Sequence, residues 1–237
     1  TYHMPLTGGS TILVPVDVSN DEHPAKDLLT ISDEVHLVLL GYYPVPDQAP
    51  PAQLKADHED DAQRRLAELV ATIDRDVTQR VVFTHDRDET VDRAAEEFDC
   101  DAILLPGSHT ATERVFVPLR GDDNLDRILS LVADLLRRDE ATATLFHAAT
   151  ADEQAYGRSL LDDAAGRLVE AGIDRARIDT RLATTDDPGT AIVELAHEFD
   201  LLVVGETEPS LTDRILGRVS TRIADEVDRP AFVVRDP

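Results

Sequence analysis

The sequence predicts an α/β fold with two lobes, each built around an open, mostly parallel sheet. Two observations predict it: strand and helix patterns alternate along the chain, and the pattern of the first lobe restarts near residue 114. Such alternation is typical of parallel strands joined by crossover helices. The length of 237 residues also suits two small domains better than one large domain. We expect a shortened domain at residues 1–113 and a complete domain at residues 114–237.

The first lobe begins with an apolar, β-branched run at residues 11–16, which predicts a buried strand. The proline-rich residues 44–51 predict a loop. The polar stretch at residues 54–73 predicts an amphipathic helix, because Leu66, Leu69 and Ile73 fall on one helical face. In chain order, we expect strands at residues 11–16, 35–43, 79–84 and 102–105, and helices at residues 22–32, 54–73 and 90–98.

The second lobe repeats this order and extends it. A strongly amphipathic helix at residues 124–138 follows its first strand. The expected strands are residues 115–119, 142–148, 178–183, 201–204 and 231–234, and the expected helices are residues 124–138, 152–171, 190–199 and 211–227.

Two local matches suggest that the lobes are copies of one unit. Residues 115–119 (VFVPL) resemble residues 12–16 (ILVPV), and residues 198–200 (EFD) repeat residues 97–99 (EFD). The offset of about 100 residues is too long for a solenoid and suits a tandem duplication of a domain.

The two copies are unequal at their ends. After Gly107, which follows the fourth strand of the first lobe, only residues 108–113 precede the next strand, so that lobe lacks its last helix and strand, or shares an element with the second lobe. The closing strand, residues 231–234, would then be an open apolar edge, and open edges seek partners. We therefore expect self-association of the protein through this strand.

The formal net charge of −25 dominates the composition. Aspartate outnumbers glutamate, and Lys26 and Lys55 are the only lysines. The acids are spread along the chain, whereas acidic interaction regions come in blocks. At molar salt the Debye length falls to about 3 Å and repulsion between exposed charges largely vanishes. The composition therefore predicts a halophilic protein, and it argues against nucleic-acid binding, which needs clustered cations.

Several classes of protein are excluded by what the sequence lacks. No apolar run reaches the roughly 20 residues of a membrane span, and the first ten residues do not resemble a secretory signal. Cys100 is the only cysteine, which rules out a disulfide framework. We find no metal-binding spacing, no nucleophile elbow and no P-loop. The sequence thus predicts a cytoplasmic protein that is not an enzyme and has no metal site.

Ligands of open parallel sheets bind beyond the carboxyl ends of the strands, where the strand order reverses. In each lobe the first and fourth strands should flank that crevice. Their ends carry residues 17–19 and 106–109 in the first lobe, and residues 120–122 and 205–209 in the second.

The residues at these strands resemble the universal stress protein (UspA-like) family. The resemblance rests on the opening VPVDVS at residues 14–19, on LVVG at residues 202–205, and on RPAFVV at residues 229–234. It covers nearly the whole chain as a tandem pair with a shortened first copy. It implies two Rossmann-like lobes of the adenine-nucleotide α-hydrolase type, arranged as the two subunits of single-domain relatives would be.

Family members that hold ATP share an Asp at the end of the first strand and a glycine loop, G-x2-G-x9-G-[ST], after the fourth. The loop amides and hydroxyl cradle the phosphates at a helix N-terminus. In the second lobe Gly205 matches the first glycine, and Glu208 replaces the second. Gly217 falls one residue early and is followed by arginine; the nearest hydroxyl groups are those of Ser220 and Thr221.

The strand ends also depart from this pattern. Asp17 and Ser19 remain in the first lobe, where no phosphate loop follows, and both residues also suit a helix cap. In the second lobe Arg120 stands where the Asp is expected. Glu206 and Glu208 would place negative charge near the phosphates. Arg120 either forms an ion pair with one of these glutamates across the crevice, or all three are solvated surface residues.

These departures favour a non-enzymatic regulatory or protective module with degenerate nucleotide clefts and no bound cofactor. A protein partner is compatible with this role, but the sequence does not identify one. The alternative is a protein that binds ATP or AMP and hydrolyses ATP weakly. An enzyme of the wider α-hydrolase class is a third hypothesis.

Overall fold

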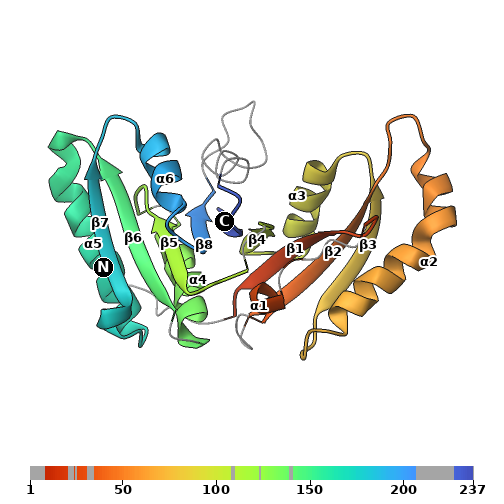
Figure 1. Cartoon of the computed structure of the whole chain (residues 1–237), viewed down its shortest axis with the longest axis horizontal. Helices are drawn as coiled ribbons and strands as arrows, with labels where there is room; N and C mark the ends of the chain where they lie inside the picture. Colours follow the sequence, from red (N-terminus) through yellow and green to blue (C-terminus); the bar gives the residue numbers. More distant parts are fainter. Residues whose placement is uncertain are drawn as a thin grey trace.

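The computed structural model describes residues 9–20, 24, 26–30, 35–107, 110–122, 124–138, 141–206 and 227–236. Within these residues the two halves share the predicted alternation of strands and helices (Figure 1). The first half comprises β1 (Thr11–Asp17), α1 (Lys26–Leu29), β2 (His36–Pro44), α2 (Pro51–Val70), β3 (Thr78–Thr84), α3 (Arg87–Glu97) and β4 (Ala102–Leu105). The second comprises β5 (Arg114–Pro118), α4 (Leu125–Arg138), β6 (Thr142–Ala149), α5 (Gln154–Glu170), β7 (Ile178–Thr184), α6 (Pro188–Ala196), β8 (Leu201–Gly205) and β9 (Ala231–Val234). The expected helix at residues 211–227 lies almost wholly outside the described residues.

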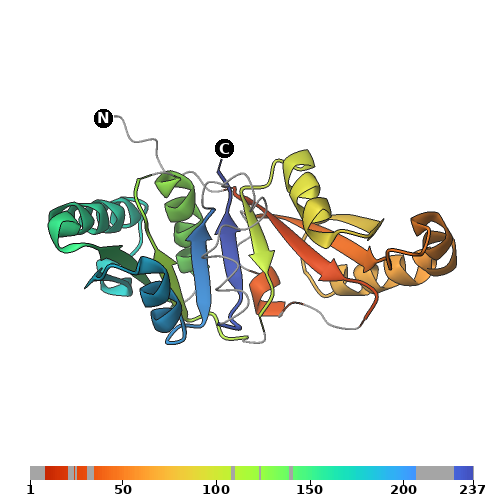
Figure 2. The same cartoon turned by 90° about the horizontal axis from the view of Figure 1, so that it is seen from above.

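All described strands belong to one nine-stranded sheet in the order β3-β2-β1-β4-β9-β8-β5-β6-β7. Read outward from the centre, each half has the same order: its fourth, first, second and third strands. Every strand pair within a half is parallel. Figure 2 shows the first half, in red to yellow, and the second half, in green to blue, meeting at β4 and β9.

The pairing of β4 with β9 corrects the expectation of an open edge. β9 runs parallel to β8 on one side and antiparallel to β4 on the other, with Ala102 opposite Val234 and Leu105 opposite Ala231. The first half therefore shares the last strand of the second half, which is one of the two outcomes that its shortened end predicts. The expected dimer through residues 231–234 has no unpaired strand edge to form through.

Apolar side chains alternate along the strands and form one core on each face of the sheet. Ile12, Val14 and Val16 belong to the core that α1, α2, α4 and α5 cover, whereas Leu13 points to the core under α3 and α6. This period of two, repeated in both halves, follows from the pleat of a strand whose two faces are both buried.

Both halves start their third helix in the same way. Asp86 accepts a hydrogen bond from the Glu89 amide at 3.0 Å, and Asp187 accepts one from the Thr190 amide at 3.1 Å. An aspartate at this position satisfies a backbone donor that the helix itself leaves unpaired.

A side-chain cluster recurs where each third helix ends. An arginine of the third strand pairs with a glutamate near that end, and its guanidinium lies 5.9 Å or 5.6 Å from the ring centre of the next phenylalanine. The residues are Arg80, Glu97 and Phe98 in the first half and Arg181, Glu198 and Phe199 in the second.

The two EFD segments align Asp99 with Asp200 in the sequence. In the structure, the residue equivalent to Asp200 lies two positions after Asp99. Asp200 accepts the Arg114 amide at the start of β5 at 3.0 Å, and Asp101 accepts the Thr11 amide at the start of β1 at 2.8 Å. Asp99 is exposed and has a left-handed φ of 49°. The counterpart of Asp200 is thus Asp101, because the first half has two more residues than the second between the phenylalanine of its EFD segment and its fourth strand.

Candidate functional site

The first and fourth strands of each half lie side by side, as the sequence predicts. β1 pairs with β4, and β5 pairs with β8. Because β4 and β9 are antiparallel, the strands of the two halves point in opposite directions. The strands of the first half therefore have their carboxyl ends on one side of the sheet, and those of the second half have theirs on the opposite side. The first crevice is defined here as the ends of β1 and β4, and the second crevice as the ends of β5 and β8.

Asp17 and Ser19 bind each other at the end of β1. One carboxylate oxygen of Asp17 accepts the Ser19 amide at 2.8 Å and the Ser19 hydroxyl at 2.6 Å. This is a local turn that closes on itself. In the described residues neither side chain caps the following helix, which begins at Lys26.

Tyr42 and Arg87 cover the same end of the sheet. The Arg87 guanidinium lies 5.5 Å from the centre of the Tyr42 ring and forms an ion pair with Asp88 at 2.9 Å. Burial raises the pKa of Tyr42; the charge of Arg87 opposes this rise, and that of Asp17 adds to it. The phenol therefore stays neutral beside Asp17 at physiological pH.

At the end of β4 the chain is closely packed around Gly107. A Cβ atom on Gly107 would lie 2.3 Å from the backbone nitrogen of Pro230 and 2.9 Å from the Cα of Arg229. The segment that leads into β9 therefore lies directly on the glycine that follows β4.

The second crevice holds Arg120, Gly205 and Glu206. The Glu206 amide donates to the Val234 carbonyl at 2.7 Å and so continues the sheet. Its carboxylate accepts the Asp236 amide at 3.2 Å. Within the described residues Arg120 is exposed and forms no ion pair with Glu206, so the ion-pair hypothesis fails for this glutamate. Glu208, Gly217, Ser220 and Thr221 lie outside the described residues.

Asn124 ties the second crevice to the end of β9. Its φ is 57°, and its side-chain amide donates to the carbonyls of Val234 at 3.3 Å and Arg235 at 2.9 Å. Arg127, one turn further along α4, donates to the same Arg235 carbonyl at 3.4 Å and lies 3.7 Å from Asp101 of the first half. The second crevice is thus braced by the first half of the chain.

Three residues that were not expected from the sequence also lie at the second crevice: His147, Tyr156 and Gly157. His147 is buried, and its Nδ1 lies 2.7 Å from the Leu119 carbonyl; since a carbonyl only accepts, Nδ1 carries the hydrogen. The Tyr156 ring meets the His147 ring edge-on, with 6.1 Å between centres. A histidine inside the apolar strand run at residues 142–149 and a glycine within the helical pattern that follows were the signals available in the sequence.

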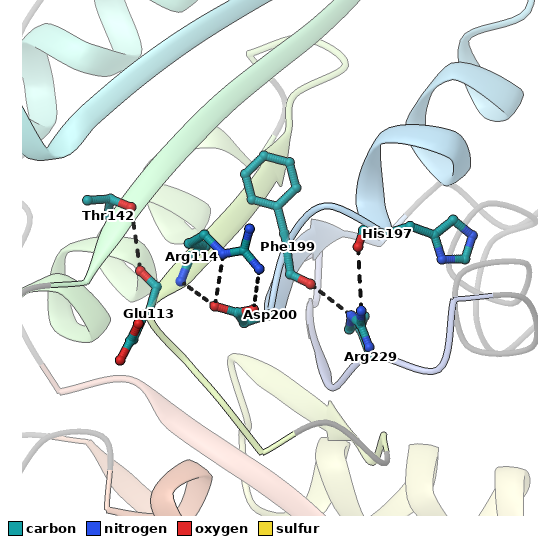
Figure 3. Close-up of polar contacts among 7 residues, drawn as sticks. All are labelled: Glu113, Arg114, Thr142, His197, Phe199, Asp200 and Arg229. Atoms are coloured by element: carbon teal, nitrogen blue, oxygen red, sulfur yellow. Dashed lines mark hydrogen bonds and ion pairs between the residues drawn. The ribbon is translucent and has the colours of Figure 1, made fainter.

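A polar cluster at the opposite end of the second half binds elements together rather than forming a crevice (Figure 3). The buried carboxylate of Asp200 accepts the amide of Arg114 and both sides of its guanidinium, at 3.0, 3.3 and 2.9 Å. Arg229 donates to the carbonyls of Phe199 and His197 near the end of α6, where a cation is favourable.

Cys100 is a free, buried cysteine. Burial raises the pKa of the Cys100 thiol to about 12, so this thiol stays protonated and unreactive. In the part of the chain that the structure describes, no group of three or more His, Cys, Asp or Glu side chains is arranged to hold a metal ion. No helix there is both long and apolar enough to cross a membrane.

Comparisons with known proteins agree with this fold. Residues 111–235 match the model of the universal stress protein family. A universal stress protein from Archaeoglobus fulgidus has a TM-score of 0.66 and 16% identity, with 96% of this chain and 98% of that chain covered. A protein of unknown function from Pseudomonas aeruginosa has a TM-score of 0.58 and 13% identity, with 98% and 94% covered. Among curated protein sequences none matches. At these identities the structural likeness concerns the fold, and it extends over both halves.

Proposed function

The chain belongs to the universal stress protein family, and from this we propose that it is a non-enzymatic regulatory or protective module whose crevices do not hold a nucleoside triphosphate. Such a module acts by binding, so its activity depends on what its surface and crevices admit. The features that favour this function are the charges and backbone contacts at the two crevices.

The observation that carries the proposal is the fixed carboxylate of Glu206 at the end of β8. The Asp236 amide holds it in place, and the Glu206 amide is already used by Val234. A phosphate brought to this strand end would meet a negative charge and would lose an amide donor. Like charges within a few ångströms cost more in a partly desolvated crevice than in water.

The first crevice supports the same function for a different reason. The approach of Pro230 to Gly107 fills the place where a phosphate loop would begin. The Asp17 carboxylate is turned toward Ser19, and Arg87 covers Tyr42. This crevice is therefore closed by side chains and backbone of its own chain.

Calorimetry with ATP and magnesium, in buffer of molar potassium chloride, tests the proposal. We expect no saturable heat with ligand up to the millimolar range. Glu206→Gln serves as the matched variant, because it keeps the shape and removes the charge. A micromolar dissociation constant for ATP in the unaltered protein would contradict the proposal.

One observation favours the alternative, a protein that binds ATP or AMP. Arg120 is exposed at the end of β5 without a described partner, and a guanidinium is a good phosphate ligand. If this alternative holds, Arg120→Ala should abolish the calorimetric signal and any slow release of phosphate from ATP.

We also infer that the chain arose by tandem duplication of a domain. The equal strand order, the repeated Arg–Glu–Phe cluster and the paired roles of Asp101 and Asp200 support it. Loss of the last helix and strand from the first copy would leave β4 unpaired, and β9 fills that position.

We further propose that the protein works in high salt, because of its net charge of −25. Circular dichroism should show the native signal in molar salt and its loss on dilution to about 0.1 M, where charges interact over about 10 Å. A structure that is equally stable at both salt concentrations would contradict this.

A further inference from the structure

Helix α2 begins without the cap that both α3 and α6 have. Its N-cap residue, Pro50, offers no side-chain hydrogen bond, and the first turn of the helix holds no acidic residue. Asp86 and Asp187, by contrast, each accept an amide at the start of α3 and α6. The unpaired amides at the start of α2 therefore lack the partner that usually stabilises a helix end.

The two ends of α2 differ in how deeply they are buried. Ala62, Leu66 and Leu69 are buried and belong to the core. Every side chain from residue 52 to residue 61 is exposed or half-buried. Figure 1 shows the helix, in orange, at the outer edge of the first half. Residues 51–61, called the strap here, thus add little buried apolar surface to the fold.

One ring contact joins the strap to the sheet. The His58 ring stacks on Tyr43 near the end of β2, with 5.2 Å between the ring centres and 13° between their planes. Tyr43 stacks in turn on Phe83 of β3, at 4.9 Å. All three rings are half-buried. Among the hydrogen bonds, ion pairs and ring contacts within the described residues, the His58 stack is the one that connects the strap to a strand.

The charges of the strap oppose its own helix. Asp57 lies three residues before Asp60 and four before Asp61, and like charges at these spacings repel each other on a helix. Lys55 pairs with Glu59 at 3.5 Å, but both side chains are exposed, so this pair contributes little. A short helical segment is marginally stable on its own in water. The strap therefore depends on the ring contact and on the screening of its acids by salt.

We propose that residues 51–61 form a salt-dependent strap, which detaches from the sheet as one unit while the rest of the molecule stays folded, and which high salt holds closed. Opening uncovers the rings of Tyr43 and Phe83 at the ends of β2 and β3. The strap gives the protein a region that responds to ionic strength before the whole fold does. This inference goes beyond the proposed function and does not depend on what the crevices bind.

Hydrogen exchange of the full chain in about 1 M potassium chloride tests the strap. We expect the amides of residues 55–61 to share one opening free energy, which is lower than that of residues 66–70. On dilution to about 0.3 M salt, protection should fall more in the strap than in residues 66–70. Asp57→Asn removes two repulsions and should raise the protection of the strap about twofold in the dilute salt.

Two pairs of variants separate the strap from ordinary fraying of a helix end. His58→Ala removes the ring contact and should lower the protection of the strap about fivefold, whereas His58→Phe keeps a ring and should stay within about twofold. Pro50→Ser supplies a cap and should raise the protection of the whole strap about fivefold, whereas Pro50→Ala lacks the hydroxyl and should not. Residues 66–70 are the internal reference and should not change in these four variants.

Three results would overturn the inference. Protection that declines residue by residue toward Pro51 would show simple fraying. Unchanged protection in His58→Ala would show that the ring does not hold the strap. Opening of the strap only together with residues 66–70 would show that it is not a separate unit.

Discussion

Gly157 and His147 occupy places that the first half fills differently. Gly41 of β2 and His147 of β6 occupy corresponding positions in the two halves of the sheet. The bulk of the imidazole is accommodated because the facing helix α5 carries a glycine. Helix and strand are therefore sterically complementary at this contact, although glycine is a poor helix former.

Gly157→Ala should destabilise the protein. The new methyl group would lie 2.6 Å from His147 Cδ2 and 2.8 Å from Leu182 Cδ1, and neither the buried imidazole nor the packed leucine can yield freely. Overpacking of this kind costs about 1–3 kcal/mol. Urea unfolding in molar salt measures it.

Gly166 in the same helix provides the control. A Cβ there meets nothing within 4 Å. Gly166→Ala should therefore stabilise the protein by about 0.5–1 kcal/mol through helix propensity alone. Equal effects of the two substitutions would show that the contact with His147 is not tight.

At the scale of elements, the start of each first strand is fixed by one aspartate. The buried carboxylate of Asp200 binds the backbone and the side chain of Arg114. This contact holds the entry to β5 against the entry to β8, and the contact of Asp101 with Thr11 does the same for β1 and β4.

Asp200→Asn should cost about 1.5–3 kcal/mol of unfolding free energy, because an amide replaces a charged acceptor of several hydrogen bonds. Asp99→Asn is the control: Asp99 is exposed at a left-handed φ that asparagine tolerates, so the change should stay within about 0.5 kcal/mol. If Asp99 were the true counterpart of Asp200, its substitution would be the costly one in the first half.

The order of elements could be predicted because most strands are compact apolar runs and most of the helices between the strands are amphipathic. The pairing of β4 with β9 could not be predicted. Ala102–Leu105 and Ala231–Val234 are both uniformly apolar, and such a pattern indicates burial on both faces without naming the neighbour. The sequence therefore left open whether β9 was an edge or a shared strand.

The candidate site could also be predicted only in part. The rule for strand ends located Asp17, Ser19, Arg120, Gly205 and Glu206 from the sequence alone. This rule considers only strands, so it could not identify a residue that a helix contributes to the site. Tyr156 comes from α5, and its place beside Gly121 depends on the packing of a helix that the motif does not include.

At the scale of the molecule, α3 of the first half lies near the second crevice. The charges that act on Asp92 of α3 show this proximity. Burial raises the pKa of Asp92 to about 6; the charge of Arg235 opposes the rise, and Glu206, Glu96 and Asp88 add to it. Arg235 and Glu206 belong to the second half. Charges of both halves therefore decide the protonation of one side chain.

The native state binds a proton at Asp92 more tightly than the unfolded chain, where the pKa is about 3.9. The stabilising contribution of the protonated form is therefore complete below pH 4 and is lost as the pH rises to 6. A shift of two units is about 2.7 kcal/mol at most, and solvent reduces it to about 1 kcal/mol for a half-exposed group. Asp92→Asn should gain that amount at pH 7.5 and none at pH 4, measured by urea unfolding. An equal gain at both pH values would contradict this account.

A single sheet across both halves should make the protein unfold as one unit. β9 lies between β4 and β8 and is buried throughout, with Phe232 and Val233 at 0% exposure. Without β9, the apolar strand β4 would expose an unpaired edge, and the first half could not bury its fourth strand. Thermal unfolding in molar salt should therefore show one transition, and hydrogen exchange should show β1 and β5 opening with the same free energy.

Phe232→Ala removes a fully buried ring and should lower the free energy of this shared opening by about 3–5 kcal/mol. The loss should appear equally in both halves, whereas two independent domains would lose stability only in residues 114–237.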